Sequence, residues 1–168
     1  MRRVLVIGIP GAGKSTFSRA LAERTGLPLI HLDREFWQPG WTMTPLPEWR
    51  GKVTELAARD CWIMDGNYGG SLPLRLPRAD AVFWFDYPTL RCLRRVLWRF
   101  ATARGRVRDD MANGCAERLD LEFLRYVRTF NAKSRPRIVA ALAEFGEHVS
   151  PVVFRRDGEV TQFLAALS

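Results

Sequence analysis

The chain of 168 residues has few of the features that mark secreted, metal-binding or membrane proteins. Its three cysteines, Cys61, Cys92 and Cys115, are an odd number and lack the paired spacing of a zinc site or a disulfide framework. We therefore expect reduced thiols in a cytoplasmic protein. No apolar run approaches the roughly 20 residues of a transmembrane helix. The short run at 4–9 ends in a glycine-rich turn instead of a signal-peptide cleavage site, so we expect no contact with a membrane.

Lysine is also scarce, because the cations are 23 arginines and only three lysines. The net charge of +8 lies in one segment: residues 91–137 hold thirteen basic residues against five acidic ones, and the rest of the chain holds thirteen of each. Arginine presents a planar fork that binds two phosphate oxygens at once, which lysine cannot do. The clustered charge therefore predicts a polyanionic partner, either the phosphates of a nucleotide or a nucleic-acid backbone.

Short apolar runs alternate with helix-like stretches along the chain. Five runs are apolar on both faces, as strands covered by helices on both sides should be: 4–9, 27–32, 61–66, 81–86 and 148–154. We expect helices at 14–24, 47–59, 88–104 and 117–145, the last kinked or interrupted at Pro136, and a short helix at the end of the chain. This order predicts one doubly wound α/β domain over 1–168, with a five-stranded parallel sheet. The polar segment 101–117 is expected to form a mobile loop.

The most specific motif is GIPGAGKS at 8–15, which matches G-x-x-x-x-G-K-[ST] between an expected strand and an expected helix. Glycines let the backbone turn so that successive N–H groups, together with the start of the helix, surround anionic oxygens. Lys14 would reach the β- and γ-phosphates, and the Ser15 hydroxyl would bind Mg²⁺. The motif predicts nucleotide contacts from Gly8, Pro10, Gly11, Ala12, Gly13, Lys14, Ser15 and Thr16.

Two acidic residues follow expected strands at the same edge of the sheet. Asp65 ends the run at 61–66, where a carboxylate that binds Mg²⁺ through water belongs, and Asp33 ends the run at 27–32. Acids at strand ends also serve as helix caps, so a structural role stays open for both, above all for Asp33. The chain has no D-x-x-G and no N-K-x-D motif, which argues against a GTPase.

Beyond these motifs the chain resembles the adenylate kinase superfamily of small P-loop kinases. The resemblance rests on Asp65-Gly66, on the sequence FDYP at 85–88, and on Arg95 and Arg99, four residues apart on the next helix. It implies ATP and Mg²⁺ as cofactors and an arginine-rich lid at about 101–117. Residues four apart share one helix face, so both guanidinium groups could converge on the γ-phosphoryl. The lid would return to a helix with the candidate substrate contacts Arg118, Arg125 and Arg128.

Within that superfamily, the segments 31–41, 65–80 and 111–126 resemble DNA topology modulation proteins, a group of kinase-like proteins of uncertain substrate. Adenylate kinases carry F-P-R after the acid-glycine pair, whose arginine holds the acceptor phosphate. Here Asn67-Tyr68-Gly69 stands in that place, so the acceptor does not follow from the resemblance, and Arg75, the next arginine, is a candidate substrate contact. Trp37 and neighbouring aromatic residues form either a wall on which an acceptor ring stacks or a hydrophobic cluster that closes the core.

The sequence thus favours a kinase that transfers the γ-phosphoryl of ATP·Mg²⁺ to a small acceptor, whose hydroxyl Asp33 would orient or deprotonate. The alternative is a nucleotide-regulated nucleic-acid-binding protein that affects DNA topology, because the same arginine segment could bind backbone phosphates. No helix-turn-helix, RNP or zinc-finger pattern supports it. An ATPase switch without a small acceptor is a third possibility. His31 has no partner acid at a recognisable spacing and is expected simply to pack at a strand end, and the oligomeric state is not predicted.

Overall fold

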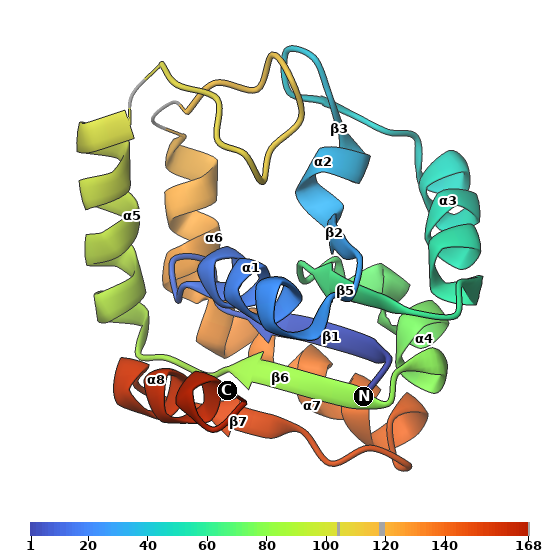
Figure 1. The fold of residues 1–168 in the computed structure, drawn as a ribbon. Helices are drawn as coiled ribbons and strands as arrows, with labels where there is room; N and C mark the ends of the chain where they lie inside the picture. The colour runs from blue at the N-terminus through green and yellow to red at the C-terminus, as the bar shows by residue number, and fades with distance from the viewer. Residues whose placement is uncertain (104, 118–119, 168) are drawn as a thin grey trace.

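The computed structural model describes residues 1–103, 105–117 and 120–167, and its centre is a parallel sheet of five strands (Figure 1). The strand order is β2-β5-β1-β6-β7. Each strand matches one of the predicted apolar runs, with β1 beginning one residue earlier: β1 at Arg3–Gly8, β2 at Leu29–His31, β5 at Trp62–Asp65, β6 at Ala81–Phe85 and β7 at Val152–Phe154. Because all strands are parallel, their carboxyl ends meet at one edge of the sheet, where ligands bind in such folds.

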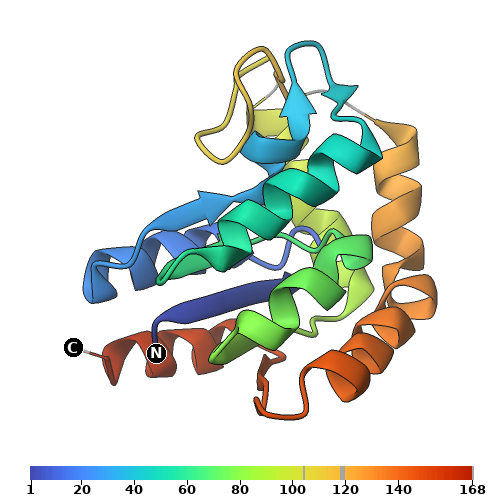
Figure 2. The ribbon, with the colours of Figure 1, turned by 90° about the vertical axis from the view of Figure 1, so that its right-hand side faces the viewer.

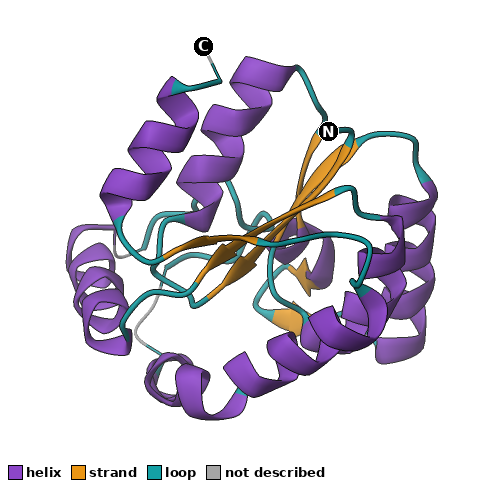
Figure 3. Ribbon diagram, turned by 90° about the horizontal axis from the view of Figure 1, so that it is seen from below, coloured by secondary structure: helices purple, strands orange, loops and turns teal. Residues whose placement is uncertain are grey.

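Helices cover both faces of this sheet (Figure 3). On one face, α1 packs against β1, β2, β5 and α8, and on the other α4 packs against α3 and α7. The remaining pair, α5 and α6, pack against each other. The bounds are α1 Lys14–Thr25, α3 Leu46–Ala58, α4 Leu72–Arg75, α5 Thr89–Ala103, α6 Leu121–Lys133, α7 Arg135–Phe145 and α8 Asp157–Ala165.

The expected long helix at 117–145 is two helices. Asp120 caps the first, since its carboxylate accepts hydrogen bonds from the backbone N–H groups of Glu122 and Phe123 at 2.8 and 3.1 Å. Pro136 lies in the first turn of α7, where the missing N–H of proline costs nothing because that N–H would have no helical partner. The chain therefore starts a new helix at the proline instead of bending one.

Several short elements were not predicted. The helix α2 (Leu32–Phe36) follows β2 directly, and the two-stranded hairpin of β3 (Trp37–Gln38) and β4 (Thr42–Met43) follows α2. Two single 3₁₀ turns, at Gly69–Ser71 and Leu76–Arg78, flank α4. The hairpin stands at one end of the molecule beside the loop 105–117 (Figure 2). Within the described part of the chain, no helix is long and apolar enough to cross a membrane.

Candidate functional site

The loop Gly8–Ser15, called the P-loop below, connects β1 to α1 as the motif requires. Gly8, Gly11 and Gly13 have φ angles of 130°, 84° and 97°, which side chains rarely tolerate. A Cβ on Gly8 would lie 2.2 Å from the Phe85 carbonyl oxygen, and a Cβ on Gly11 would lie 2.7 Å from that of Cys92 in α5. Gly8 and Gly11 are therefore required both by backbone angle and by the close approach of β6 and α5, and Gly13 by its backbone angle alone.

Asn67 fixes the start of this loop. Its side-chain amide accepts a hydrogen bond from the Gly8 N–H and donates one to the Gly8 carbonyl, both at 2.8 Å. The sequence analysis missed this role, although the replacement of F-P-R by Asn67-Tyr68-Gly69 is the signal that could have revealed it. The loop after β5 thus contacts the P-loop through the Asn67 amide.

Lys14 is the cation of the P-loop and is partly buried. Its Nζ donates to the Ile9 carbonyl at 3.1 Å. Burial lowers the pKa of Lys14, although the negative charges of Asp65 and Asp33 oppose this shift. These two carboxylates and Lys14 therefore lie near one another, as the P-loop hypothesis requires. Thr16 is exposed in the first turn of α1.

Asp65 pairs with His31, which was not expected to have an acidic partner. The two residues are opposite each other in the register of β2 and β5, and the His31 Nδ1 lies 2.9 Å from the Asp65 Oδ2. Both side chains are less than one-tenth exposed. The expectation that His31 merely packs was wrong, because its partner lies 34 residues away and meets it only through strand pairing.

Asp33 lies in α2, and its Oδ1 accepts a hydrogen bond of 2.6 Å from the Tyr68 hydroxyl. Burial raises the pKa of Asp33, and the charge of Asp65 raises it further, against the opposing effects of Tyr68, Arg108 and Lys14. Burial likewise raises the pKa of the Tyr68 phenol, which therefore remains a donor. Asp33 is therefore a carboxylate with increased proton affinity. The Tyr68 phenol orients it, and it lies near Lys14.

The aromatic residues around this point divide into two groups. Phe36, Trp49 and Tyr68 pack with ring centroids about 5 Å apart, and Phe36 and Trp49 are buried in the main core. Trp37 is only partly buried, and its ring contacts Trp41 at 5.4 Å. Phe36 and Trp49 therefore close the core, as one of the two interpretations expected, and Trp37 lies at the border of the core.

The loop 105–117, called the lid loop below, is docked on the hairpin. Its buried side chains pack against Trp37 and Trp41: Met111, Ala112 and Cys115. The Trp41 Nε1–H donates to the Ala116 carbonyl at 3.2 Å, and the Gly40 N–H donates to the Gly114 carbonyl at 3.3 Å. In this structure the expected mobile loop is therefore held in place by the β3–β4 hairpin, a segment that the sequence analysis left without regular structure.

Acidic residues of the lid loop bind one arginine of α5 and one of the loop itself. Arg99 donates from Nε to Glu117 at 3.0 Å, and Arg108 lies 3.4 Å from Glu117 and 3.3 Å from Asp110. Burial tends to raise the pKa of Asp110, but Arg108 and the Ser15 hydroxyl outweigh it and lower that pKa. The lid loop thus brings Asp110 to the P-loop serine, a neighbour that the sequence did not predict.

Arg95 and Arg99, although four residues apart, are held by different carboxylates. Arg95 donates to Asp157 at 2.6 Å and lies 3.5 Å from the Ala12 carbonyl, whereas Arg99 is bound to Glu117. Arg99 is also close enough to Lys14 to oppose its protonation. The expected convergence of both guanidinium groups on one phosphate is therefore not present here: Arg99 is near Lys14, and Arg95 is near Ala12.

Arg75 does not contact the site as expected. It is fully buried and donates to the Ser71 hydroxyl and the Gly66 carbonyl, both at 3.2 Å, and to the carbonyls of Asn67 and Tyr68. Burial lowers the pKa of Arg75 to about 9. Its N–H groups bind the loop that carries Asn67 and Tyr68, so Arg75 stabilises the conformation of that loop.

The structure describes two of the three arginines that were expected to contact the substrate after the lid. Arg125 and Arg128 are exposed on α6, and Arg118 lies outside the described residues. Tyr126, between the first two, is near Asp33 and Asn67, since both affect its pKa, which burial raises. Successive helix residues are about 100° apart, so Arg125 lies about 100° around α6 from Tyr126 and Arg128 lies roughly on the opposite side of the helix.

No protein-family model and no curated protein matches the chain. Among solved structures, it is similar to shikimate kinase from Acinetobacter baumannii in complex with shikimate, with a TM-score of 0.60, 17% sequence identity, and coverage of 99% of this chain and 93% of that one. The chain has the P-loop kinase fold. A gluconokinase from Sinorhizobium meliloti 1021 gives a TM-score of 0.53 at 18% identity, with 99% and 90% covered. The predicted α/β class with its five-stranded parallel sheet is thereby confirmed.

Proposed function

We propose that the protein is an ATP-dependent kinase that transfers the γ-phosphoryl group to a hydroxyl of a small acceptor. One observation carries this proposal: the P-loop lysine, Lys14, and a carboxylate with a raised pKa, Asp33, lie together at the end of the P-loop. A donor-phosphate site and a proton acceptor at one place are what hydroxyl phosphorylation needs. The P-loop kinase fold is consistent with it.

The donor side consists of the P-loop amides, Lys14 and Arg99. Ser15 and Asp65 offer hard oxygen atoms that fit Mg²⁺, which proteins commonly hold by one or two carboxylates or hydroxyls together with phosphates and water. When bound, Mg²⁺ neutralises charge on the β- and γ-phosphates. Among the described residues, no three His, Cys, Asp or Glu side chains form a metal cluster of their own. His31 orients Asp65 toward this role.

On the acceptor side, Asp33 takes the proton of the acceptor hydroxyl as the oxygen–phosphorus bond forms and the bond from the γ-phosphorus to the β–γ bridging oxygen breaks. Its raised pKa makes it a stronger base than an ordinary exposed carboxylate. Tyr68 keeps the carboxylate oriented through its 2.6 Å hydrogen bond. Trp37, partly exposed beside Phe36, would contact the acceptor, and Arg118, Arg125 and Arg128 stay predicted contacts to substrate phosphates.

An acceptor screen tests the proposal. Purified protein is incubated with ATP and Mg²⁺ and with nucleosides, nucleoside monophosphates, shikimate, gluconate or related hydroxylated metabolites, and ADP is measured. We expect one class to raise ADP formation far above the rate with water alone, and Lys14→Ala to abolish the increase. ATP binding without any acceptor-dependent turnover would contradict the kinase and favour an ATPase.

Five of the arginines that prompted the nucleic-acid alternative are paired with carboxylates within the molecule. Arg91 and Arg95 bind Asp157, Arg99 and Arg108 bind Glu117, and Arg135 binds Asp86 at 2.9 Å. Guanidinium groups that are paired within the molecule do not form the continuous basic surface that backbone phosphates need. We therefore keep the kinase as the single proposed function.

A further inference from the structure

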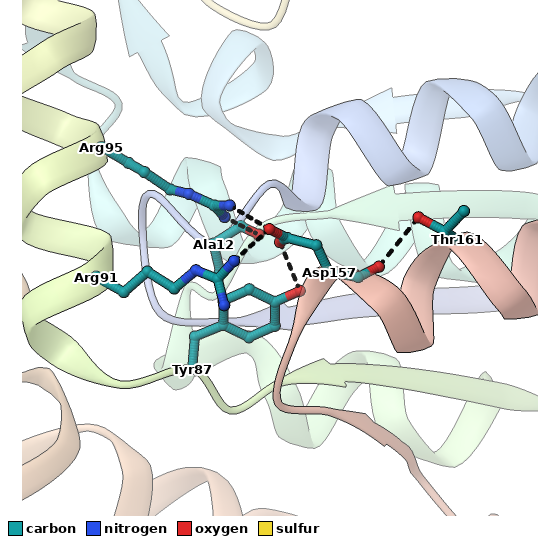
Figure 4. A network of polar contacts seen from close by, with 6 residues as sticks. All are labelled: Ala12, Tyr87, Arg91, Arg95, Asp157 and Thr161. Carbon is teal, nitrogen blue, oxygen red and sulfur yellow. Dashed lines mark hydrogen bonds and ion pairs between the residues drawn. The ribbon is translucent and has the colours of Figure 1, made fainter.

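Asp157 joins parts of the molecule that are far apart in the sequence (Figure 4). It is the first residue of α8, and one carboxylate oxygen accepts hydrogen bonds from Arg91 and from Arg95, the latter at 2.6 Å. The Tyr87 hydroxyl donates to the other oxygen at 3.0 Å. Both guanidinium groups also lie over the Tyr87 ring, 5.4 and 5.8 Å from its centroid. One carboxylate thus holds two arginines of the same helix.

This cluster lies on the flank of the P-loop opposite the acceptor side. In the sheet, β1 leads into the P-loop, the acceptor residues follow β2 and β5 on one side, and the Asp157 cluster follows β6 and β7 on the other. Arg95 reaches the P-loop itself, because its Nη1 lies 3.5 Å from the Ala12 carbonyl oxygen. With the γ-phosphoryl at Lys14 and Asp33, the nucleoside end of a nucleotide extends toward Arg95 and Asp157.

The arrangement is open to a ligand and depends on the carboxylate. The Arg95 and Asp157 side chains are 37% and 48% exposed. Like charges one helical turn apart repel each other, so without Asp157 the guanidinium groups of Arg91 and Arg95 would separate into solvent. Partial burial tends to raise the pKa of Asp157, but hydrogen bonds from Arg95 and Tyr87 and the charges of the arginines lower it, so the carboxylate is ionised at neutral pH.

We propose that Asp157 is a positioning residue for the nucleotide: by holding Arg95 beside Ala12, it sets the contact between Arg95 and the nucleoside part of ATP. This inference rests on the proposed function, because it requires a nucleotide on the P-loop. A purely structural role would be the alternative, since an acid in the first turn stabilises a helix through its dipole. Glu159 provides the matched control, because it lies in the same first turn but binds Arg155 and Arg156 instead of α5.

The test compares ATP with inorganic tripolyphosphate, each titrated calorimetrically in the presence of Mg²⁺. Tripolyphosphate lacks the nucleoside, so the ratio of the two dissociation constants removes the effect of changing the overall charge. We expect Asp157→Asn to reduce the preference for ATP by about tenfold, which corresponds to roughly 1.4 kcal/mol. Glu159→Gln should leave the ratio unchanged, and Asp157→Glu should restore most of it.

A double-mutant cycle with Arg95→Met identifies the route of the effect. If Asp157 acts through Arg95, Asp157→Asn changes the ratio little once Arg95 is replaced. An unchanged ratio in Asp157→Asn, an equal loss in Glu159→Gln, or full additivity with Arg95→Met overturns the inference. A wild-type protein that binds neither ligand overturns the proposed function as well, whereas binding of both ligands together with any of those three results overturns only the role of Asp157.

Discussion

The His31 imidazole and the Asp65 carboxylate lie 2.9 Å apart where β2 and β5 end. Their strands are parallel and adjacent, so the pair stands at the edge of the sheet to which the P-loop also leads. Because both side chains are less than one-tenth exposed, water does not compete for this hydrogen bond. The imidazole therefore fixes the orientation of the carboxylate that we propose for Mg²⁺.

Replacing His31 should weaken the binding of Mg²⁺ more than it lowers the stability of the fold. His31→Ala removes the partner of a buried carboxylate, and the loss of such an outer-shell contact typically costs 10–100-fold in metal affinity or activity. We expect the Mg²⁺ concentration that supports half-maximal turnover to rise about tenfold. His148→Ala is the control, because His148 bonds only to the Ala79 carbonyl at 2.9 Å. An equal effect of both variants on Mg²⁺ dependence would contradict the role of His31.

The pH dependence should report Asp33. Its pKa is raised by burial and by Asp65, and it acts as a base only when deprotonated, so activity falls as the pH falls through this pKa. The Tyr68 hydrogen bond stabilises the ionised form, so Tyr68→Phe should raise the pKa of Asp33 and move the acidic limb of the kcat/KM profile upward by about one pH unit. Asp33→Asn should remove turnover while ATP still binds. A limb that moves downward in Tyr68→Phe, or stays in place, would rule out Asp33 as the titrating base.

Much of the fold followed from the sequence, because its signals are local. Apolar runs marked all five strands, and the glycines around Lys14 marked the turn into α1. The hairpin at 37–43 carries no such signal, because its strands are two residues each and its turn uses a left-handed backbone at Gly40 and Trp41. Short elements of this kind are stabilised by tertiary contacts, here with the lid loop, and not by their own pattern.

The sequence predicted the part of the site that lies in one continuous motif. It did not predict pairs of residues that are far apart in the sequence. The P-loop residues form a continuous segment, whereas His31 needs strand register to meet Asp65, and Asp157 in α8 needs the fold to bring it to the arginines of α5. The position of Arg75 was not predictable for another reason. A charged residue after the acid-glycine pair suggests a contact to a ligand, because arginine is rarely buried without a partner. Here backbone carbonyls are those partners.

Arg75 should contribute to stability more than any exposed arginine nearby. Arg75→Met removes the guanidinium donors to the Gly66 and Asn67 carbonyls, whereas the Tyr68 carbonyl keeps the Ser71 N–H at 2.8 Å; the loss should cost about 3 kcal/mol of unfolding free energy. Arg78→Met, three residues on, removes only an exposed contact of 3.3 Å to the Ala58 carbonyl and should change stability by roughly 0.5 kcal/mol or less. Denaturant unfolding measures both, and comparable losses would mean that the loop does not depend on Arg75.

The docking of the lid loop on the hairpin should be visible through Cys115. This thiol is 1% exposed beneath Trp41, so it reacts with a thiol reagent only when the lid loop leaves the hairpin. In a background in which the other two cysteines are replaced by alanine, Trp41→Leu should accelerate labelling of Cys115 at least about tenfold, because it removes both the ring packing and the 3.2 Å hydrogen bond to Ala116.

The control for this experiment is Trp98→Leu, which changes a tryptophan that is 72% exposed on α5 and should leave the labelling rate unchanged. If the lid loop closes over a bound nucleotide together with the hairpin, ATP should slow labelling in the wild type and in Trp98→Leu, and to a smaller extent in Trp41→Leu. Labelling of Cys115 that is fast in the wild type would show that the lid loop is not held by the hairpin in solution. Labelling that ATP accelerates would show that the nucleotide separates the two segments instead of joining them.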